Sequence, residues 1–128
     1  MVDSSIKKIL LAEDDRNLSR SLDTWLTLEG FEVDTVYNGE EALHKLLQES
    51  YDLLITDIAM PRLNGVDLIS RIRDVTPRLP IMVVSGKLNE ELMQQLRGMA
   101  VDHMLPKPIK PLEFRKVIGR LFPDNMLA

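Results

Sequence analysis

Five short segments with strand-like patterns, each followed by a segment with helical periodicity, constrain this chain more than any other feature of its sequence. Four are mostly apolar runs, at residues 8–12, 53–55, 81–85 and 103–105, and the fifth, 31–36, alternates apolar and polar residues. In the segments that follow them, apolar residues recur every three or four positions, as they do along one face of a helix. Strands that alternate with helices in this way predict an α/β fold, with a five-stranded, doubly wound parallel sheet and helices on both faces.

Local signals indicate where these helices begin and end. Gly30 follows the first helical segment, and a left-handed residue commonly ends a helix. Asn89 can cap the fourth segment, which runs to about Met99, and Pro111 fits the first turn of the last segment. We expect the first, second and last helices to turn these residues inward: Leu18, Leu22, Trp25, Leu26 and Leu28; Ala42, Leu43, Leu46 and Leu47; Leu112, Phe114, Val117, Ile118 and Leu121.

Polar side chains stand at or just after the ends of several predicted strands. Right-handed crossovers place the carboxyl ends of all parallel strands on one edge of the sheet, where ligands of open α/β sheets bind. Residues far apart in sequence should therefore meet there. The expected cluster is Glu13, Asp14, Asp57, Ser85 and Lys107.

Length and composition limit the class of protein. The 128 residues predict one domain, 1–128, with a core from about residue 7 to residue 121. The 16 basic and 20 acidic residues are scattered along the chain, which argues against direct nucleic-acid binding. The chain has no cysteine, a polar start and no apolar run approaching about 18 residues. We therefore expect a cytoplasmic protein without disulfide, signal peptide or membrane span.

The clustered carboxylates predict metal-assisted phosphate chemistry. Carboxylate oxygens suit Mg²⁺, which proteins hold through one or two carboxylates plus phosphate oxygens. Carboxylates about 4 Å apart repel by roughly 4 kcal/mol at an effective dielectric constant of about 20, so a cation or proton must compensate them. Beside such a metal, Asp57 can form an acyl phosphate. Lys107 and Ser85 could bind the phosphoryl oxygens, although each alone would be interpreted as structural.

Four motifs give the chain a resemblance to a known family: ILLAEDD, ITDIAMPRLNG, VVSG and LPKP. With them it resembles the receiver domain of bacterial two-component response regulators over about residues 7–121. The resemblance implies the flavodoxin-like receiver fold, in which a βα unit is repeated five times. It also implies a signalling domain rather than an enzyme, one that assists its own phosphorylation and dephosphorylation.

The resemblance assigns the phosphoacceptor and its metal ligands. Asp57, just before the Met-Pro turn, would accept phosphate from a histidine kinase with Mg²⁺ as cofactor. The metal ligands would be Glu13, Asp14, Asp57 and the backbone carbonyl of Ala59. Of these, Asp14 is expected to contact the ion directly and Glu13 to act through water.

The resemblance also assigns the switch. Ser85 would be the switch hydroxyl, and Lys107 the lysine that binds the phosphoryl group, before a Lys107-Pro108 bond that is usually cis in the family. Met104 replaces the usual aromatic residue three positions before the lysine, so the familiar coupled rearrangement cannot occur in its usual form. Two further departures are Ala100, where glycine is common, and Ser85-Gly86, where Thr-Ala or Ser-Ala is frequent.

The resemblance also implies partners, and spacing points to residues that would tune phosphate loss. A histidine kinase or phosphotransfer protein would be the donor, and a downstream protein or fused output domain the recipient of the signal. Helix four, strand five and helix five would form the switch surface, with a phosphorylation-dependent dimer through it. Ala59 and Lys87, two residues past Asp57 and Ser85, would tune dephosphorylation.

Three alternative functions fit the sequence less well. A haloacid-dehalogenase-type phosphohydrolase needs a second acid where Ala59 stands. A flavodoxin-like cofactor binder needs a phosphate-cradling loop after the first strand, where adjacent carboxylates would repel phosphate. The third alternative is a receiver-like interaction module without phosphate cycling, against which the complete set of site residues argues. His44 and His103 are interpreted as structural rather than phosphate-bearing.

Overall fold

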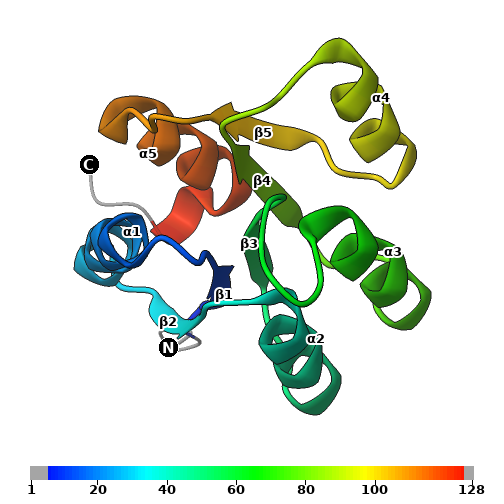
Figure 1. Cartoon of the computed structure of the whole chain (residues 1–128). Helices are drawn as coiled ribbons and strands as arrows, with labels where there is room; N and C mark the ends of the chain where they lie inside the picture. Colours follow the sequence, from blue (N-terminus) through cyan, green and yellow to red (C-terminus); the bar gives the residue numbers. More distant parts are fainter. Residues whose placement is uncertain (1–5, 126–128) are drawn as a thin grey trace.

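The computed structural model describes residues 6–125 and has five parallel strands in one sheet, in the order β2-β1-β3-β4-β5 (Figure 1). The strands are β1 (Lys8–Ala12), β2 (Glu32–Val36), β3 (Leu53–Asp57), β4 (Ile81–Ser85) and β5 (His103–Pro106). The helices are α1 (Arg16–Leu28), α2 (Gly39–Gln48), α3 (Gly65–Val75), α4 (Glu90–Gly98) and α5 (Pro111–Leu121), followed by the 3₁₀ turn η1 (Pro123–Asn125). The predicted fold class is confirmed.

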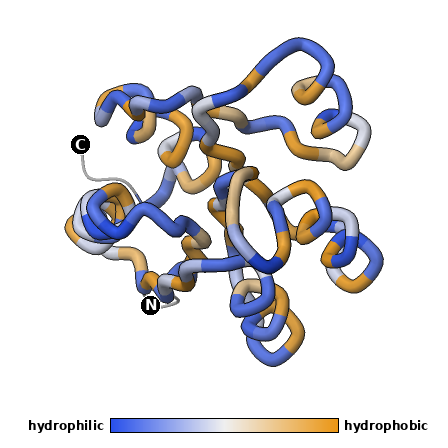
Figure 2. Tube along the Cα trace, in the orientation of Figure 1, coloured by the Kyte–Doolittle hydropathy of each residue, from blue (hydrophilic) through white to orange (hydrophobic). Residues whose placement is uncertain are grey.

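Two layers of helices cover the two faces of the sheet. Successive strand side chains point to opposite faces, so Leu10 and Leu54 pack beneath α2, α3 and α4, whereas Ile9 and Ile55 pack beneath α1 and α5. Figure 1 shows this division, with α1 and α5 on one side of the sheet. Apolar residues concentrate on the central strands and alternate with polar ones along the helices (Figure 2). Strands buried on both faces explain why their sequences read as continuous apolar runs.

Side chains cap the starts of the first four helices. The asparagines Asn38, Asn64 and Asn89 each accept a hydrogen bond from the main-chain N–H three residues later. Asp15 caps α1 in the same way by accepting from two main-chain N–H groups. The predicted Asn89 cap and the left-handed Gly30, with a φ of 94°, are both confirmed.

Some residues expected to face inward are exposed. Leu28 and Leu112 are 72% and 74% exposed, and Leu47 is 56% exposed. Leu28 and Leu112 each lie two positions from a buried residue, about 200° around the helix, so they point toward solvent. Element ends also differ by one or two residues, since β2 begins at Glu32, β3 includes Asp57, β5 reaches Pro106 and α4 ends at Gly98.

Ala100 adopts a left-handed conformation, with a φ of 61°, in the turn between α4 and β5. Glycine would take this conformation without a steric cost. Arg73 of α3 holds the turn, because its guanidinium donates to Met99 O at 2.8 Å and to Ala100 O at 3.0 Å. The same group donates to Leu79 O at 2.6 Å and so joins two connections at the amino-terminal edge of the sheet.

Candidate functional site

The expected polar cluster lies at the carboxyl ends of the strands. Carboxylate oxygens of Glu13, Asp14 and Asp57 all lie within 4.8 Å of one another. Lys107 follows β5 and reaches the same point, with its Nζ 2.7 Å from Asp57 Oδ2 and 2.8 Å from Glu13 Oε1. Ser85, at the end of β4, is linked to Lys107 through the main chain, because Lys107 N donates a hydrogen bond to Ser85 O at 2.9 Å. Topology thus brings together residues up to 94 positions apart, from Glu13 to Lys107.

Asp57 is buried and held on both carboxylate oxygens. Asp57 is only 4% exposed to solvent. Oδ1 accepts hydrogen bonds from Ile58 N at 2.6 Å and Ala59 N at 3.3 Å, while Oδ2 accepts one from Lys107 Nζ. Thr56 Oγ1 donates to the Asp57 carbonyl at 2.8 Å, a contact that the sequence analysis did not foresee. The carboxylate therefore has one defined orientation at the strand end.

Glu13 is fully buried and incompletely hydrogen-bonded. Its Oε2 accepts a hydrogen bond from Asp15 N at 3.0 Å. Its Oε1 lies 2.8 Å from Lys107 Nζ, which is its one partner among the described residues. Burial raises the pKa of Glu13 above its ordinary value, and the nearby Lys107 offsets this only in part. A carboxylate oxygen can accept at two lone pairs, so a buried one with a single partner can take a further ligand.

Lys107 is the cation that compensates this cluster among the described residues. Burial by itself lowers the pKa of Lys107, but hydrogen bonds to Asp57 and Glu13 outweigh burial and the net pKa is raised. The Lys107-Pro108 bond is cis, as the resemblance implied. One lysine faces two buried carboxylates and the exposed Asp14, so the cluster retains an excess of negative charge.

The proposed switch and tuning residues lie around this center. Ser85 is buried, and its Oγ accepts a hydrogen bond from Lys87 N at 3.2 Å. Met104 is half-buried on β5, pairs in register with Val83 and packs against the core on the α2, α3 and α4 face. Ala59 and Lys87 are exposed in the loops after β3 and β4. Their roles stay predictions.

Asp15 has a different role from the two acidic residues that precede it. The carboxylates of Glu13 and Asp14 approach Asp57, whereas Asp15 caps α1. An acidic residue just before a helical segment is a known start signal, and it could have separated Asp15 from its neighbours. His44 is exposed on α2 and His103 is half-buried on β5.

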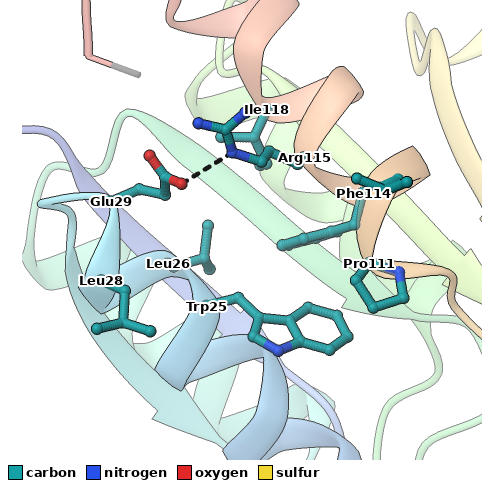
Figure 3. Close-up of a pocket in the computed structure, with 9 residues that line it drawn as sticks. Trp25, Leu26, Leu28, Glu29, Pro111, Phe114, Arg115 and Ile118 are labelled. Carbon is teal, nitrogen blue, oxygen red and sulfur yellow. Dashed lines mark hydrogen bonds and ion pairs between the residues drawn. The ribbon is translucent and has the colours of Figure 1, made fainter. Parts of the chain in front are cut away.

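An apolar pocket of about 200 Å³ lies elsewhere, between α1 and α5 (Figure 3). Trp25, Phe114 and Ile118 line it together with the exposed Leu112. At the rim, Arg115 Nε donates to Glu29 Oε1 at 2.9 Å. None of the clustered carboxylates lines this pocket, so the candidate chemistry belongs to the sheet edge.

The donor set at the sheet edge fits a small divalent cation. All its available side-chain ligands are carboxylate oxygens, the type that Mg²⁺ prefers. The buried Glu13 Oε1, which has Lys107 as its one partner among the described residues, would gain a second partner from an ion or from one of its waters. The residues present therefore fit Mg²⁺.

Comparison with known proteins identifies the class. The family model described as "Response regulator receiver domain" matches residues 9–119, so the chain belongs to that family. It is 40% identical over 117 residues to a CpxR homolog of Haemophilus influenzae, described as a transcriptional regulatory protein, covering 91% of this chain and 49% of that protein. Response regulator ArlR of Staphylococcus aureus is 32% identical over 117 residues, which cover 89% of this chain and 50% of ArlR. The chain spans about half the length of these curated relatives.

Solved structures give the same class. A CheY-like receiver domain protein from Methanospirillum hungatei superposes with a TM-score of 0.88 at 26% identity, covering 94% of this chain and 97% of that one. Response regulator TrrA from Thermotoga maritima, solved in complex with Mg(2+)-BeF, superposes with a TM-score of 0.81 at 32% identity, covering 91% of this chain and 100% of TrrA. Within residues 6–125, every helix is too short or too polar to cross a bilayer.

Proposed function

We propose that Asp57 accepts a phosphoryl group from a phosphohistidine of a histidine kinase or phosphotransfer protein. An Asp57 carboxylate oxygen bonds to phosphorus as the donor's nitrogen–phosphorus bond breaks, and the leaving imidazole keeps the bonding pair and takes up a proton. The observation that carries the proposal is the fixed, buried Asp57 carboxylate, held by two amides and Lys107. A nucleophile held in place favours transfer because little orientational entropy is lost during the reaction.

Glu13, Asp14, Asp57 and the backbone carbonyl of Ala59 would hold Mg²⁺ in this proposal. When bound, the ion supplies positive charge that offsets charge on the transferring phosphoryl oxygens. The three convergent carboxylates and the buried Glu13 oxygen, paired with Lys107 alone among the described residues, support the assignment. The Mg(2+)-BeF complex of TrrA, a relative by structure, supports it as well.

Lys107 and Ser85 would bind the phosphoryl oxygens and report their arrival. The Lys107 ammonium already donates to Asp57 Oδ2 and can transfer that hydrogen bond to a phosphoryl oxygen. Ser85 Oγ, which accepts from Lys87 N, would turn toward the phosphoryl group and draw the following loop inward.

Met104 would then repack behind Ser85. A flexible thioether fills such gaps at smaller cost than an aromatic ring and defines one state less sharply. We therefore expect exchange between two states of Met104 without phosphate, measurable by relaxation-dispersion NMR and reduced after phosphorylation. Ser85→Ala should still be phosphorylated but shift the Met104 signals far less, and full propagation in that variant would refute the switch role.

The aspartyl phosphate should be hydrolysed slowly by the domain itself. Attack requires a water in line with the bond to phosphorus, and Ala59 has no group that could hold one. The exposed Lys87 is the remaining candidate. Ala59→Asn should therefore shorten the phosphoryl lifetime, measured by the decay of the phosphorylated mass. An unchanged or longer lifetime would remove Ala59 from this role.

The assembly around this domain follows from the same proposal. Residues 1–128 would form one cytoplasmic receiver domain that regulates a downstream protein or fused output domain, without itself binding DNA or a membrane. α4, β5 and α5 would form the output surface and could pair two phosphorylated copies. The names of the relatives, a transcriptional regulatory protein and a response regulator, support a regulatory output.

One experiment separates this function from an interaction module that does not cycle phosphate. The domain is incubated with acetyl phosphate and Mg²⁺, and the site of added mass is mapped by peptide mass spectrometry. We expect a single hydroxylamine-labile phosphoryl group on Asp57 and none in Asp57→Asn. Mapping of the added mass to His44 or another residue would overturn the assignment, and no added mass would favour the interaction module.

A further inference from the structure

Two helices begin with a glycine that lies against the loop after β3. Gly39 is the first residue of α2 and Gly65 the first of α3. A Cβ atom on Gly65 would lie 2.3 Å from Asp57 O, and one on Gly39 would lie 1.9 Å from Leu63 O. Contacts this short do not occur for real side chains, so neither position has room for a methyl group. The loop of residues 58–64 is thus contacted by two helix starts.

The loop side of the Gly39 contact is fixed. Leu63 N donates to Pro61 O at 2.8 Å, and the Leu63 side chain is buried in the core together with Met60. Gly65 N donates to Ile58 O at 2.8 Å, which closes the loop on itself beside Asp57. A displaced Leu63 carbonyl would therefore disturb buried packing or these turns.

The α2 side of the contact is fixed as well. Asn38 caps the helix by accepting from Glu41 N at 2.9 Å. Ala42 and Leu46 anchor the same helix in the core, where both are buried. By contrast, a Cβ on Gly98 in α4 would meet nothing within 4 Å, so the requirement for glycine at Gly39 is specific to its contact with the loop.

We propose that Gly39 is a positioning residue for the chemistry at Asp57. The start of α2 contacts the Leu63 carbonyl and so sets the position of the loop that carries Ala59, whose carbonyl is a proposed Mg²⁺ ligand. The inference rests on the proposed function of Asp57. Its physical basis is that both sides of the contact are anchored in the core, so a change at Gly39 must move the loop or the helix.

The test compares Gly39→Ala with two controls. Gly98→Ala adds the same methyl group in open space, and Leu46→Ala weakens the packing of α2 without pushing on the loop. Backbone amide shifts, Mg²⁺ dissociation constants from NMR titration and rates of phosphorylation by acetyl phosphate are measured for each. The results for each variant are compared with its melting temperature.

Gly39→Ala should shift the amides of residues 58–64 and weaken both Mg²⁺ binding and phosphorylation by a factor of ten or more, since displacements of about 1 Å at such sites can cost on the order of 100-fold. Gly98→Ala should match the parent. Leu46→Ala should melt lower yet keep the parent's Mg²⁺ affinity. Unchanged Mg²⁺ binding and phosphorylation in a folded Gly39→Ala would overturn the proposal, because α2 rather than the loop would have moved.

A second measurement needs no variant. Adding Mg²⁺ with beryllofluoride to the parent should shift the Gly39 amide, while that of Gly30, at the opposite edge of the sheet, should stay in place. A Gly39 amide that does not respond would overturn the coupling. If the parent itself bound no Mg²⁺, the proposed function would fail, and the amide shifts of metal-free Gly39→Ala would still decide whether α2 positions the loop.

Discussion

Each edge of the sheet has a lysine surrounded by carboxylates, and the two clusters differ in how fully their charges are satisfied. At the amino-terminal edge, Lys8 Nζ lies 2.5 Å from Glu49, 3.6 Å from Asp34 and 3.7 Å from Glu32. At the carboxyl-terminal edge, Lys107 lies between Glu13 and Asp57. Similar residue types therefore occur in a structural cluster and in the candidate site.

Two acids of the Lys8 cluster have partners besides Lys8. Tyr51 Oη donates to Asp34 at 2.7 Å, and Lys45 pairs with Glu49 at 3.2 Å in addition to Lys8. Hydrogen bonds from Lys8 and Lys45 lower the pKa of Glu49, whereas burial raises the pKa of Glu13. The two pKa values shift in opposite directions. The fold therefore stabilises the ionised form of Glu49 and disfavours the ionised form of Glu13.

The difference distinguishes structural charge from functional charge. A partly exposed ion-pair network with enough partners is a common surface feature that contributes modestly to stability. A buried carboxylate with too few partners destabilises the fold unless a ligand binds, which is why such groups concentrate at functional sites. Burial and the number of partners for each acid, rather than the presence of a lysine with acids, separate the two edges.

Removing the lysine from each cluster should give the largest difference in stability between the two edges. In EDTA, Lys107→Ala should lower the free energy of unfolding by about 2 kcal/mol, less than the roughly 3–5 kcal/mol for breaking a fully buried pair because Lys107 is partly exposed. Urea unfolding followed by circular dichroism measures this. The variant should remain folded, regain stability with Mg²⁺ and accept phosphate more slowly.

Lys8→Ala is the matched control. Its acids keep Tyr51, Lys45 and water as partners, so the loss of stability should be smaller and Mg²⁺ should not restore it. Equal losses for the two variants, or recovery of Lys8→Ala by Mg²⁺, would show that the two edges are electrostatically alike.

Asp57→Asn should have the next largest effect, with the opposite sign. It removes one carboxylate from the site, so in EDTA the variant should be more stable than the parent by about 1 kcal/mol. Millimolar Mg²⁺ should stabilise the parent, by about 2.7 kcal/mol at a hundredfold excess over the dissociation constant, and the variant much less. Thermal melts with and without Mg²⁺ measure both. A variant that melts below the parent in EDTA would contradict the excess of negative charge.

The sequence was informative wherever local pattern decides structure. Strand positions could be predicted to within one or two residues because buried parallel strands read as apolar runs, and the sheet topology then placed Asp57 and Lys107 at one edge. Leu28 and Leu112 were predicted wrongly because an apolar residue two positions from a buried one was assigned to the same face, although two residues turn a helix by about 200°.

Properties that depend on packing between distant segments could not be predicted. Glu13 and Asp14 are adjacent acids in the sequence, yet one is fully buried and the other exposed. The contact of Gly39 with Leu63 depends on how α2 docks beside the loop after β3, and no spacing in the sequence encodes that distance. The Arg73 hydrogen bonds to the left-handed Ala100 turn are of the same kind.

The smallest and most specific contrast is in the pH dependence of stability in EDTA. The folded-state pKa of Glu49 is lowered from 4.5, so its contribution to stability is present above the unfolded pKa and is lost as the pH falls through the folded value. Glu49→Gln should therefore be less stable than the parent at neutral pH, and the two should converge in acid. The measurement is a series of urea titrations at stepped pH.

Glu13→Gln should show the opposite sign. The folded-state pKa of Glu13 is raised from 4.5, so its favourable contribution is fully present only below the unfolded pKa and is lost as the pH rises through the folded value. Glutamine resembles the protonated acid, so this variant should be more stable than the parent at neutral pH and converge with it in acid. Two variants that deviate in the same direction would mean that Lys107 compensates Glu13 as completely as Lys8 compensates Glu49, and the case for a ligand at the carboxyl-terminal edge would lose its electrostatic basis.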